Sequence, residues 1–196
     1  MSSTTAHLHL EATLVVACYP LTLIEEDPRT AFSELLAALE ELGDDHAVVL
    51  TLPNADTGGR ALIDMVQPAA AERDDLIAVA SLGQRRYWSC LHHAGAVVGN
   101  SSSVLIEAPV VGVRAIDVGE RQRGRLRADA VVHVPPDRQE IADAIRLAVS
   151  KGPAPRESPY GDGRAAERIV EVLREVGDAS TLLDKPFHEI EQVEAT

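Results

Sequence analysis

The chain alternates short, uninterrupted apolar segments with longer segments of helical periodicity, and this alternation constrains its fold more than any other feature. Strands are expected at residues 14–18, 47–50, 76–80, 96–98, 113–118 and 130–134. Helices are expected at about 28–43, 59–71, 84–95, 137–150 and 163–176, with another opening near residue 103. Strands without polar alternation are typical of a parallel sheet that is covered on both faces. We therefore predict an α/β fold with a doubly wound, Rossmann-like parallel sheet.

The length of 196 residues suits one such domain, because a chain of this size can bury a substantial core. We expect an N-terminal extension over residues 1–12, a Rossmann-like domain over 13–178 and an acidic tail over 179–196. The tail follows a helix that we expect to close the domain.

The charge balance narrows the range of partners. Eighteen basic and 31 acidic residues give a net charge of −13, and an acidic surface repels nucleic acid and anionic lipid. No uncharged apolar run approaches the length of a membrane-spanning helix. Cys18 and Cys90 lie among apolar neighbours and are expected to be buried thiols in a reducing cytosol, which indicates a cytoplasmic protein.

Functional residues are expected directly after the strands, because open α/β sheets bind ligands at the carboxyl ends of their strands. The segments in that position are residues 19–22, 53–60, 81–84, 100–103 and 119–127. They also hold most of the unusual sequence in the chain, and this agreement indicates one site along that edge of the sheet.

The segment from Gly99 to Glu107 is the sharpest local feature. It leaves a strand, offers three successive serines and opens a helix, so its backbone N–H groups and hydroxyls could hold a phosphate. Glu107 could accept paired hydrogen bonds from a sugar diol. The alternative is an ordinary helix N-cap with an acidic residue near the positive helix end. Both interpretations remain open at this stage.

Residues 119–127 carry four arginines within seven positions, which is unusual in so acidic a chain. Guanidinium groups after a strand suit a diphosphate, because each can make paired bonds to anionic oxygens. A solvated loop that pairs with acidic neighbours is the alternative, and we expect it for most of these arginines. From this run we expect Arg121 alone to contact a ligand.

Other motifs indicate little chemistry. Residues 53–60 could form a simple strand-to-helix turn, and they lack the spacing of a dinucleotide or P-loop site. The pair His92-His93 is expected to end a helix, since a metal site would need a third ligand that the sequence does not place. No metal and no cofactor is expected.

Seven segments together resemble the UDP-N-acetylglucosamine 2-epimerase family. They are residues 20–23, 53–60, 81–84, 99–103, 107–109, 119–125 and 158–163. Their order matches over about residues 14–176, and the hydrolysing branch that feeds sialic-acid biosynthesis is the better match. The non-hydrolysing branch typically has an Asp-Ser-Gly-Gly type sequence where this chain has Asn100-Ser101-Ser102-Ser103.

The resemblance implies a glycosyltransferase-B type fold, of which this chain resembles the C-terminal half. In that fold UDP or UDP-N-acetylglucosamine lies between two Rossmann-like domains. The resemblance implies that Ser101 and Ser102 hold the diphosphate, that Glu107 holds the ribose hydroxyls and that Arg121 supports the phosphates. The implied substrate-binding set also includes Asn54, lining the cleft, and Asn100.

The family reaction converts UDP-N-acetylglucosamine to N-acetylmannosamine and UDP, and several of its carboxylates belong to the N-terminal half. Tyr19 also stands where family members usually carry a histidine, and a phenol with an ordinary pKa near 10 is a poor proton shuttle. Two function classes follow. The chain is either the UDP-binding part of an epimerase, completed by a separately encoded Rossmann domain, or a non-catalytic UDP-binding domain or gene remnant. Self-association through the exposed cleft face is a further expectation.

Overall fold

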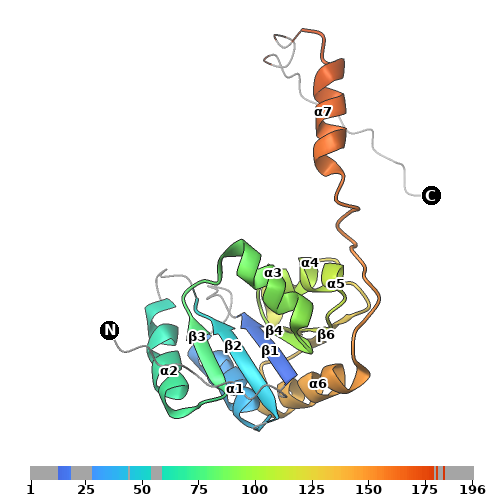
Figure 1. Cartoon of the computed structure of the whole chain (residues 1–196). Coiled ribbons are helices and arrows are strands. Elements are labelled where there is room, and N and C mark those ends of the chain that lie inside the picture. Colours follow the sequence, from blue (N-terminus) through green and yellow to red (C-terminus); the bar gives the residue numbers. More distant parts are fainter. Residues whose placement is uncertain are drawn as a thin grey trace, which may run out of the picture. The chain divides into compact units, whose positions relative to one another are not determined.

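Six parallel strands form one sheet in the order β3-β2-β1-β4-β5-β6 (Figure 1). The computed structural model describes residues 13–18, 28–43, 45–53, 59–178, 180 and 183. The strands are β1 (Thr13–Cys18), β2 (His46–Thr51), β3 (Leu76–Val79), β4 (Ala96–Gly99), β5 (Ala115–Val118) and β6 (Val131–Val134). Every pair of neighbouring strands is parallel, which confirms the predicted Rossmann-like α/β fold.

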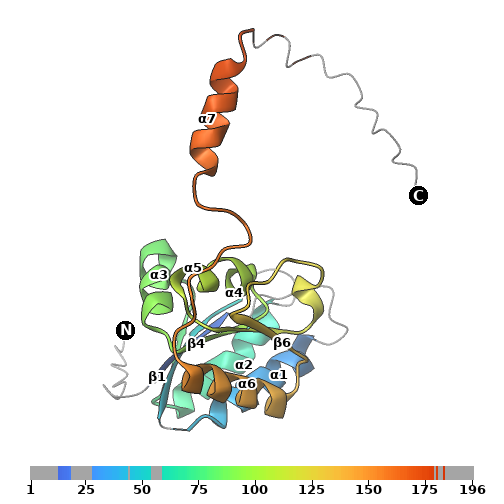
Figure 2. The same ribbon diagram turned by 90° about the vertical axis from the view of Figure 1, so that its right-hand side faces the viewer.

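Helices cover the sheet on both faces (Figures 1 and 2). One face packs against α1 (Pro28–Glu40), α2 (Gly59–Glu72) and α6 (Arg138–Lys151). The other packs against α3 (Gly83–His93), α4 (Ser102–Ile106) and α5 (Ala108–Val111). Alternate residues of β1 enter the two cores, Val15 on the first side and Val16 on the second, and both are fully buried. This is why the strands carry no polar alternation.

The strand order reverses between β1 and β4, whose carboxyl ends therefore lie side by side. Gly99 ends β4 in register with Cys18 of β1. Its φ is 143°, and a Cβ atom placed there would lie 1.8 Å from the Cys18 carbonyl oxygen. No side chain fits so close to a neighbouring backbone, so glycine is required at this end of the strand.

The helix expected after residue 103 is divided into α4 and α5. Pro109 lies in the first turn of α5, where its lack of an N–H group is tolerated. Gly112 ends α5 with a φ of 81°, and the Val113 N–H still donates to the Ala108 carbonyl. Val113 therefore belongs to a turn, and β5 begins two residues later than the sequence predicts.

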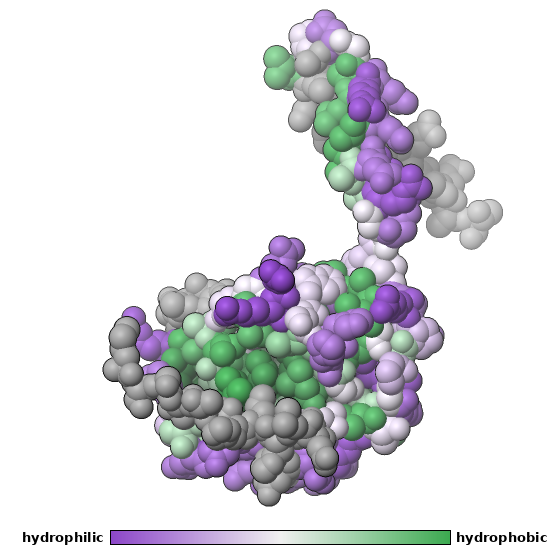
Figure 3. All heavy atoms as spheres, viewed as in Figure 1, coloured by the Kyte–Doolittle hydropathy of each residue, from purple (hydrophilic) through white to green (hydrophobic). Residues whose placement is uncertain are grey.

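The chain divides into two units, the first ending at Tyr160 and the second beginning at Gly161. The second contains α7 (Ala165–Glu175), which we expected to belong with the sheet in one domain of residues 13–178. Apolar side chains gather along one side of α7 (Figure 3). Ile169, Val172 and Leu173 are each about three-fifths exposed. Within its own unit, this apolar side of α7 lies in water.

None of the helices within the described residues has the length and apolar character needed to cross a membrane. The cytoplasmic location and the exclusion of nucleic acid stay predictions.

Candidate functional site

A pocket of about 520 Å³ opens at the carboxyl edge of the sheet, where the sequence predicts a site. Strand β1 contributes Cys18, its neighbour β2 contributes Thr51, and α3 contributes Tyr87 and Trp88. The remaining lining residues are Leu52, Ala80, Ser81, Leu82, Gly83, Gln84, Ser101, Ser102, Ser103, Glu107 and Arg121. Segments far apart in sequence thus converge on one hollow, which can hold a ligand of about nucleotide size.

The serine segment, residues 101–103, forms one wall of the pocket at the start of α4. Ser101 is the N-cap of α4, and its Oγ accepts a hydrogen bond from the Ser103 N–H at 3.3 Å. The Glu107 N–H donates to the Ser103 carbonyl, and the Glu107 side chain lines the pocket. The capping interpretation is therefore correct for Ser101. It does not exclude a ligand, because Ser101, Ser102 and Ser103 are all among the residues that line the pocket.

Asn100 lies behind this wall rather than in it. Its side chain is fully buried, and neither its amide oxygen nor its amide nitrogen has a hydrogen-bond partner in the part of the chain that the structure describes. Its carbonyl oxygen accepts from Arg121 Nη1 at 2.9 Å and from Gln122 Nε2 at 2.7 Å. Asn100 thus joins the serine segment to the segment after β5, which supports a structural contribution from its backbone.

Arg121 is the arginine of its run among the described residues that line the pocket, and its contact with a ligand stays a prediction. It lies in a short 3-10 turn, Glu120–Gln122, directly after β5. One of its N–H groups is held by Asn100, which leaves the rest of the guanidinium group for a ligand.

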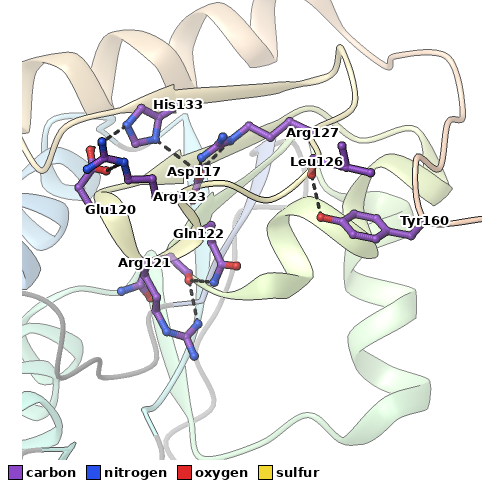
Figure 4. A network of polar contacts seen from close by, with 10 residues as sticks. Asp117, Glu120, Arg121, Gln122, Arg123, Leu126, Arg127, His133 and Tyr160 are labelled. Atoms are coloured by element: carbon purple, nitrogen blue, oxygen red, sulfur yellow. Dashed lines mark hydrogen bonds and ion pairs between the residues drawn. The ribbon is translucent and has the colours of Figure 1, made fainter. Parts of the chain in front are cut away.

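Two other arginines of the run pair with acidic neighbours (Figure 4). Arg127 donates twice to Asp117 Oδ2, at 3.1 and 2.7 Å, and Asp117 is fully buried at the end of β5. Arg123 Nε lies 3.7 Å from Glu120 Oε2, and both side chains are largely exposed. His133 of β6 is opposite Asp117 and places Nδ1 3.4 Å from the same carboxylate oxygen. This network holds the segment that presents Arg121.

Four polar side chains are hydrogen-bonded in series along the pocket. Thr51 Oγ1 donates to Cys18 Sγ at 3.2 Å, Cys18 Sγ lies 3.4 Å from the Tyr87 hydroxyl, and that hydroxyl is hydrogen-bonded to Ser103 Oγ. Burial is the main cause that raises the pKa of Tyr87 and the pKa of Cys18 above their usual values. Both groups therefore keep their protons at neutral pH.

Sequence reasoning missed Cys18, Thr51, Tyr87 and Trp88 as pocket residues. A signal existed for the first two, since each is the last residue of a strand. Tyr87 follows Gly83 by four residues, so it lies on the same side of α3 one turn later. The predicted site residues Tyr19 and Asn54 lie outside the described residues. His92 and His93 occupy the last turn of α3, as expected, and no group of metal-ligating side chains occurs among the residues described.

A family model described as UDP-N-acetylglucosamine 2-epimerase matches residues 2–174. A UDP-N,N'-diacetylbacillosamine 2-epimerase (hydrolyzing) from Legionella pneumophila is 30% identical over 138 residues, which cover 70% of this chain and 36% of that protein. A UDP-N-acetylglucosamine 2-epimerase from Neisseria meningitidis is 33% identical over 144 residues, covering 72% of this chain and 37% of that protein. The chain thus spans little more than a third of these relatives.

Solved structures share the fold over about half of their length. The UDP-GlcNAc 2-epimerase of Methanocaldococcus jannaschii, in complex with UDP-GlcNAc and UDP, matches with a TM-score of 0.67 and 16% identity. The match covers 84% of this chain and 46% of that one. The UDP complex of MnaA from S. aureus matches with a TM-score of 0.65 and 19% identity, over 90% and 48% of the two chains. The fold therefore corresponds to one half of a glycosyltransferase-B type arrangement.

Proposed function

The chain belongs to the UDP-N-acetylglucosamine 2-epimerase family, and from that premise we propose that its pocket binds the UDP moiety of UDP-N-acetylglucosamine. The observation that carries the proposal is the convergence of three kinds of group on one hollow. Serine hydroxyls come from the wall of α4, a carboxylate comes from Glu107, and a guanidinium group comes from Arg121. Hydroxyls and a guanidinium group suit a diphosphate, and a carboxylate suits a sugar diol.

Each group then has a definite role in binding. Ser101 and Ser102 donate hydrogen bonds to diphosphate oxygens, and Arg121 balances their charge. Glu107 accepts hydrogen bonds from the ribose hydroxyls. Asn54 is proposed to line the same cleft, and Asn100 supports it from behind through the carbonyl that holds Arg121.

We further propose that the chain takes part in the hydrolysing reaction, from UDP-N-acetylglucosamine to N-acetylmannosamine and UDP, only together with an N-terminal half. Proton removal and leaving-group assistance need positioned acids and bases. Glu107 is the one carboxylate among the described lining residues, and the raised pKa values of Cys18 and Tyr87 leave neither as a base at neutral pH. The missing acid–base groups must come from elsewhere.

The exposed side of α7 supports such a partner. Ile169, Val172 and Leu173 form an apolar stripe that a packed helix would bury. A separately encoded Rossmann-like domain is the partner that completes the family fold. Association of two copies of this chain is the other outcome, and sedimentation of the pure chain distinguishes the two.

A non-catalytic UDP-binding domain is the second candidate, favoured by Tyr19 at the position of the usual histidine. Release of N-acetylmannosamine from UDP-N-acetylglucosamine separates the candidates. We expect none from the pure chain. If the first candidate is correct, adding a separately produced N-terminal domain generates the product.

Thermal unfolding tests the binding proposal directly. UDP and UDP-N-acetylglucosamine at millimolar concentration are expected to raise the unfolding midpoint, and AMP is not. A ligand at about 100 times its dissociation constant stabilises by about 2.7 kcal/mol. Arg121→Ala should abolish most of the shift, whereas Arg123→Ala, which alters an exposed arginine of the same run, should leave it intact. An equal response to AMP, or no response to the uridine ligands, contradicts the proposal.

A further inference from the structure

The hydrogen-bonded series Thr51–Cys18–Tyr87–Ser103 runs along the pocket and contains no charged side chain. It joins β2, β1, α3 and α4, and all four of its residues line the pocket. Core packing alone does not require hydroxyls at these positions, since neighbouring pocket residues such as Leu52 and Leu82 are apolar. The polar groups of the series are therefore better explained by ligand binding in the adjacent pocket.

The Thr51 hydroxyl has two acceptors within reach, Cys18 Sγ at 3.2 Å and the Ala17 carbonyl oxygen at 3.4 Å. In the other two hydrogen bonds, between Cys18 and Tyr87 and between Tyr87 and Ser103, either atom can be the donor. A hydroxyl that accepts one hydrogen bond can donate another, so Tyr87 can donate to Ser103 Oγ. In that direction the Ser103 proton is left for a ligand in the pocket.

The backbone N–H of Ser103 is already held by Ser101 Oγ, so Ser103 contacts a ligand through its hydroxyl. An anionic oxygen that accepts the Ser103 proton favours the direction in which Tyr87 donates to Ser103, because each donor polarises the next.

We propose that Ser103 binds an anionic oxygen of the ligand diphosphate and that Tyr87 is a positioning residue that keeps the Ser103 hydroxyl pointed as a donor. The inference deepens the proposed function, on whose diphosphate it rests. It adds one ligand contact beyond Ser101, Ser102 and Arg121, and it gives α3 a part in holding an anion that it does not itself touch.

Calorimetric titration of the full chain with UDP and with inorganic pyrophosphate tests the inference. The variants are Tyr87→Phe, Ser103→Ala and the double variant. Tyr160→Phe and Ser150→Ala are matched controls, because each removes a hydroxyl that donates to a backbone carbonyl and lines no part of the described pocket. Unfolding midpoints of all variants show which of them fold normally.

Ser103→Ala is expected to weaken both ligands about 10-fold, the effect of one lost hydrogen bond to a charged group. Tyr87→Phe should weaken them about 3-fold to 5-fold while the chain still folds. The double variant should bind like Ser103→Ala, since a positioning residue has no effect once the group it positions is gone. The controls should bind like the original chain.

Additive losses in the double variant would overturn the positioning role, and unchanged affinity in Ser103→Ala would overturn the contact itself. If pyrophosphate binds with the expected pattern but UDP does not, the inference stands and the proposed nucleotide function fails. If both ligands bind and Tyr87→Phe has no effect, the function stands and the inference fails. If neither ligand binds the original chain, both fail.

Discussion

Helices α1 and α7 are both amphipathic, yet α1 buries its apolar side and α7 exposes it. Phe32, Leu35 and Leu39 of α1 are fully buried against the sheet. Ile169 and Leu173 of α7 are each 59% exposed. The comparison shows that an apolar stripe along a helix does not by itself determine which surface the helix packs against. In α1 the stripe stabilises the fold that surrounds it, whereas within the second unit the α7 stripe stays in water.

The largest difference between the two helices is expected on truncation of a leucine. Leu35→Ala should lower the free energy of unfolding by about 2–5 kcal/mol, because it leaves a cavity in the core. Leu173→Ala should change it by no more than about 0.5 kcal/mol, because it removes a side chain already in water. Urea unfolding of both variants measures this. A large cost for Leu173→Ala would show that α7 is already packed in solution.

Breaking an ion pair should also destabilise the first unit more than the second. Arg127→Met leaves the buried carboxylate of Asp117 without its cation, and we expect a loss of about 2–3 kcal/mol, below the value for a fully buried pair. Arg168→Met breaks the pair with Asp162, where both side chains are more than half exposed, and should leave the unfolding midpoint unchanged. Adding Asp117→Asn to Arg127→Met should restore part of the loss, since no unpaired charge then remains. If it restores nothing, the loss arises from packing of the arginine stem.

The smallest expected difference concerns the pKa values of two aspartates, one in each unit. Hydrogen bonds from the Arg73 guanidinium hold the pKa of Asp75 below its usual value, and Arg168 does the same for Asp162. A carboxyl with a lowered pKa stabilises the folded state fully above its unfolded pKa of about 3.9, and the contribution disappears as pH falls through the lower folded value.

Salt should separate the two aspartates. The Arg73–Asp75 pair is more than four-fifths buried, whereas the Arg168–Asp162 pair is exposed. At about 1 M NaCl charges in water are screened within about 3 Å, so the pKa of Asp162 should rise toward its ordinary value while that of Asp75 stays low. Carboxyl NMR titrations at low and high salt measure both. Equal responses would mean that the two pairs are equally hydrated.

Much of the fold could be predicted from the chain itself because apolar periodicity is a local property. The six strands and the capped serine segment depend on neighbours in sequence. The pairing of Arg127 with Asp117 and the part of Tyr87 in the pocket depend on contacts between distant segments. The division between α4 and α5 was missed because Pro109 lies in the first turn of α5, where proline is tolerated, and therefore gave no clear stop. Tyr19 and Asn54 remain sequence predictions.

The pocket draws its described lining from Cys18 through Arg121, a stretch that covers more than half of the chain. During synthesis, the first two strands leave the ribosome long before the arginine that completes the anion side. A nascent chain therefore lacks the cation of the site until the segment after β5 is in place, and a fragment ending before residue 121 never acquires it. A ligand can therefore stabilise the complete fold by binding to it, but it cannot stabilise the early stages of folding.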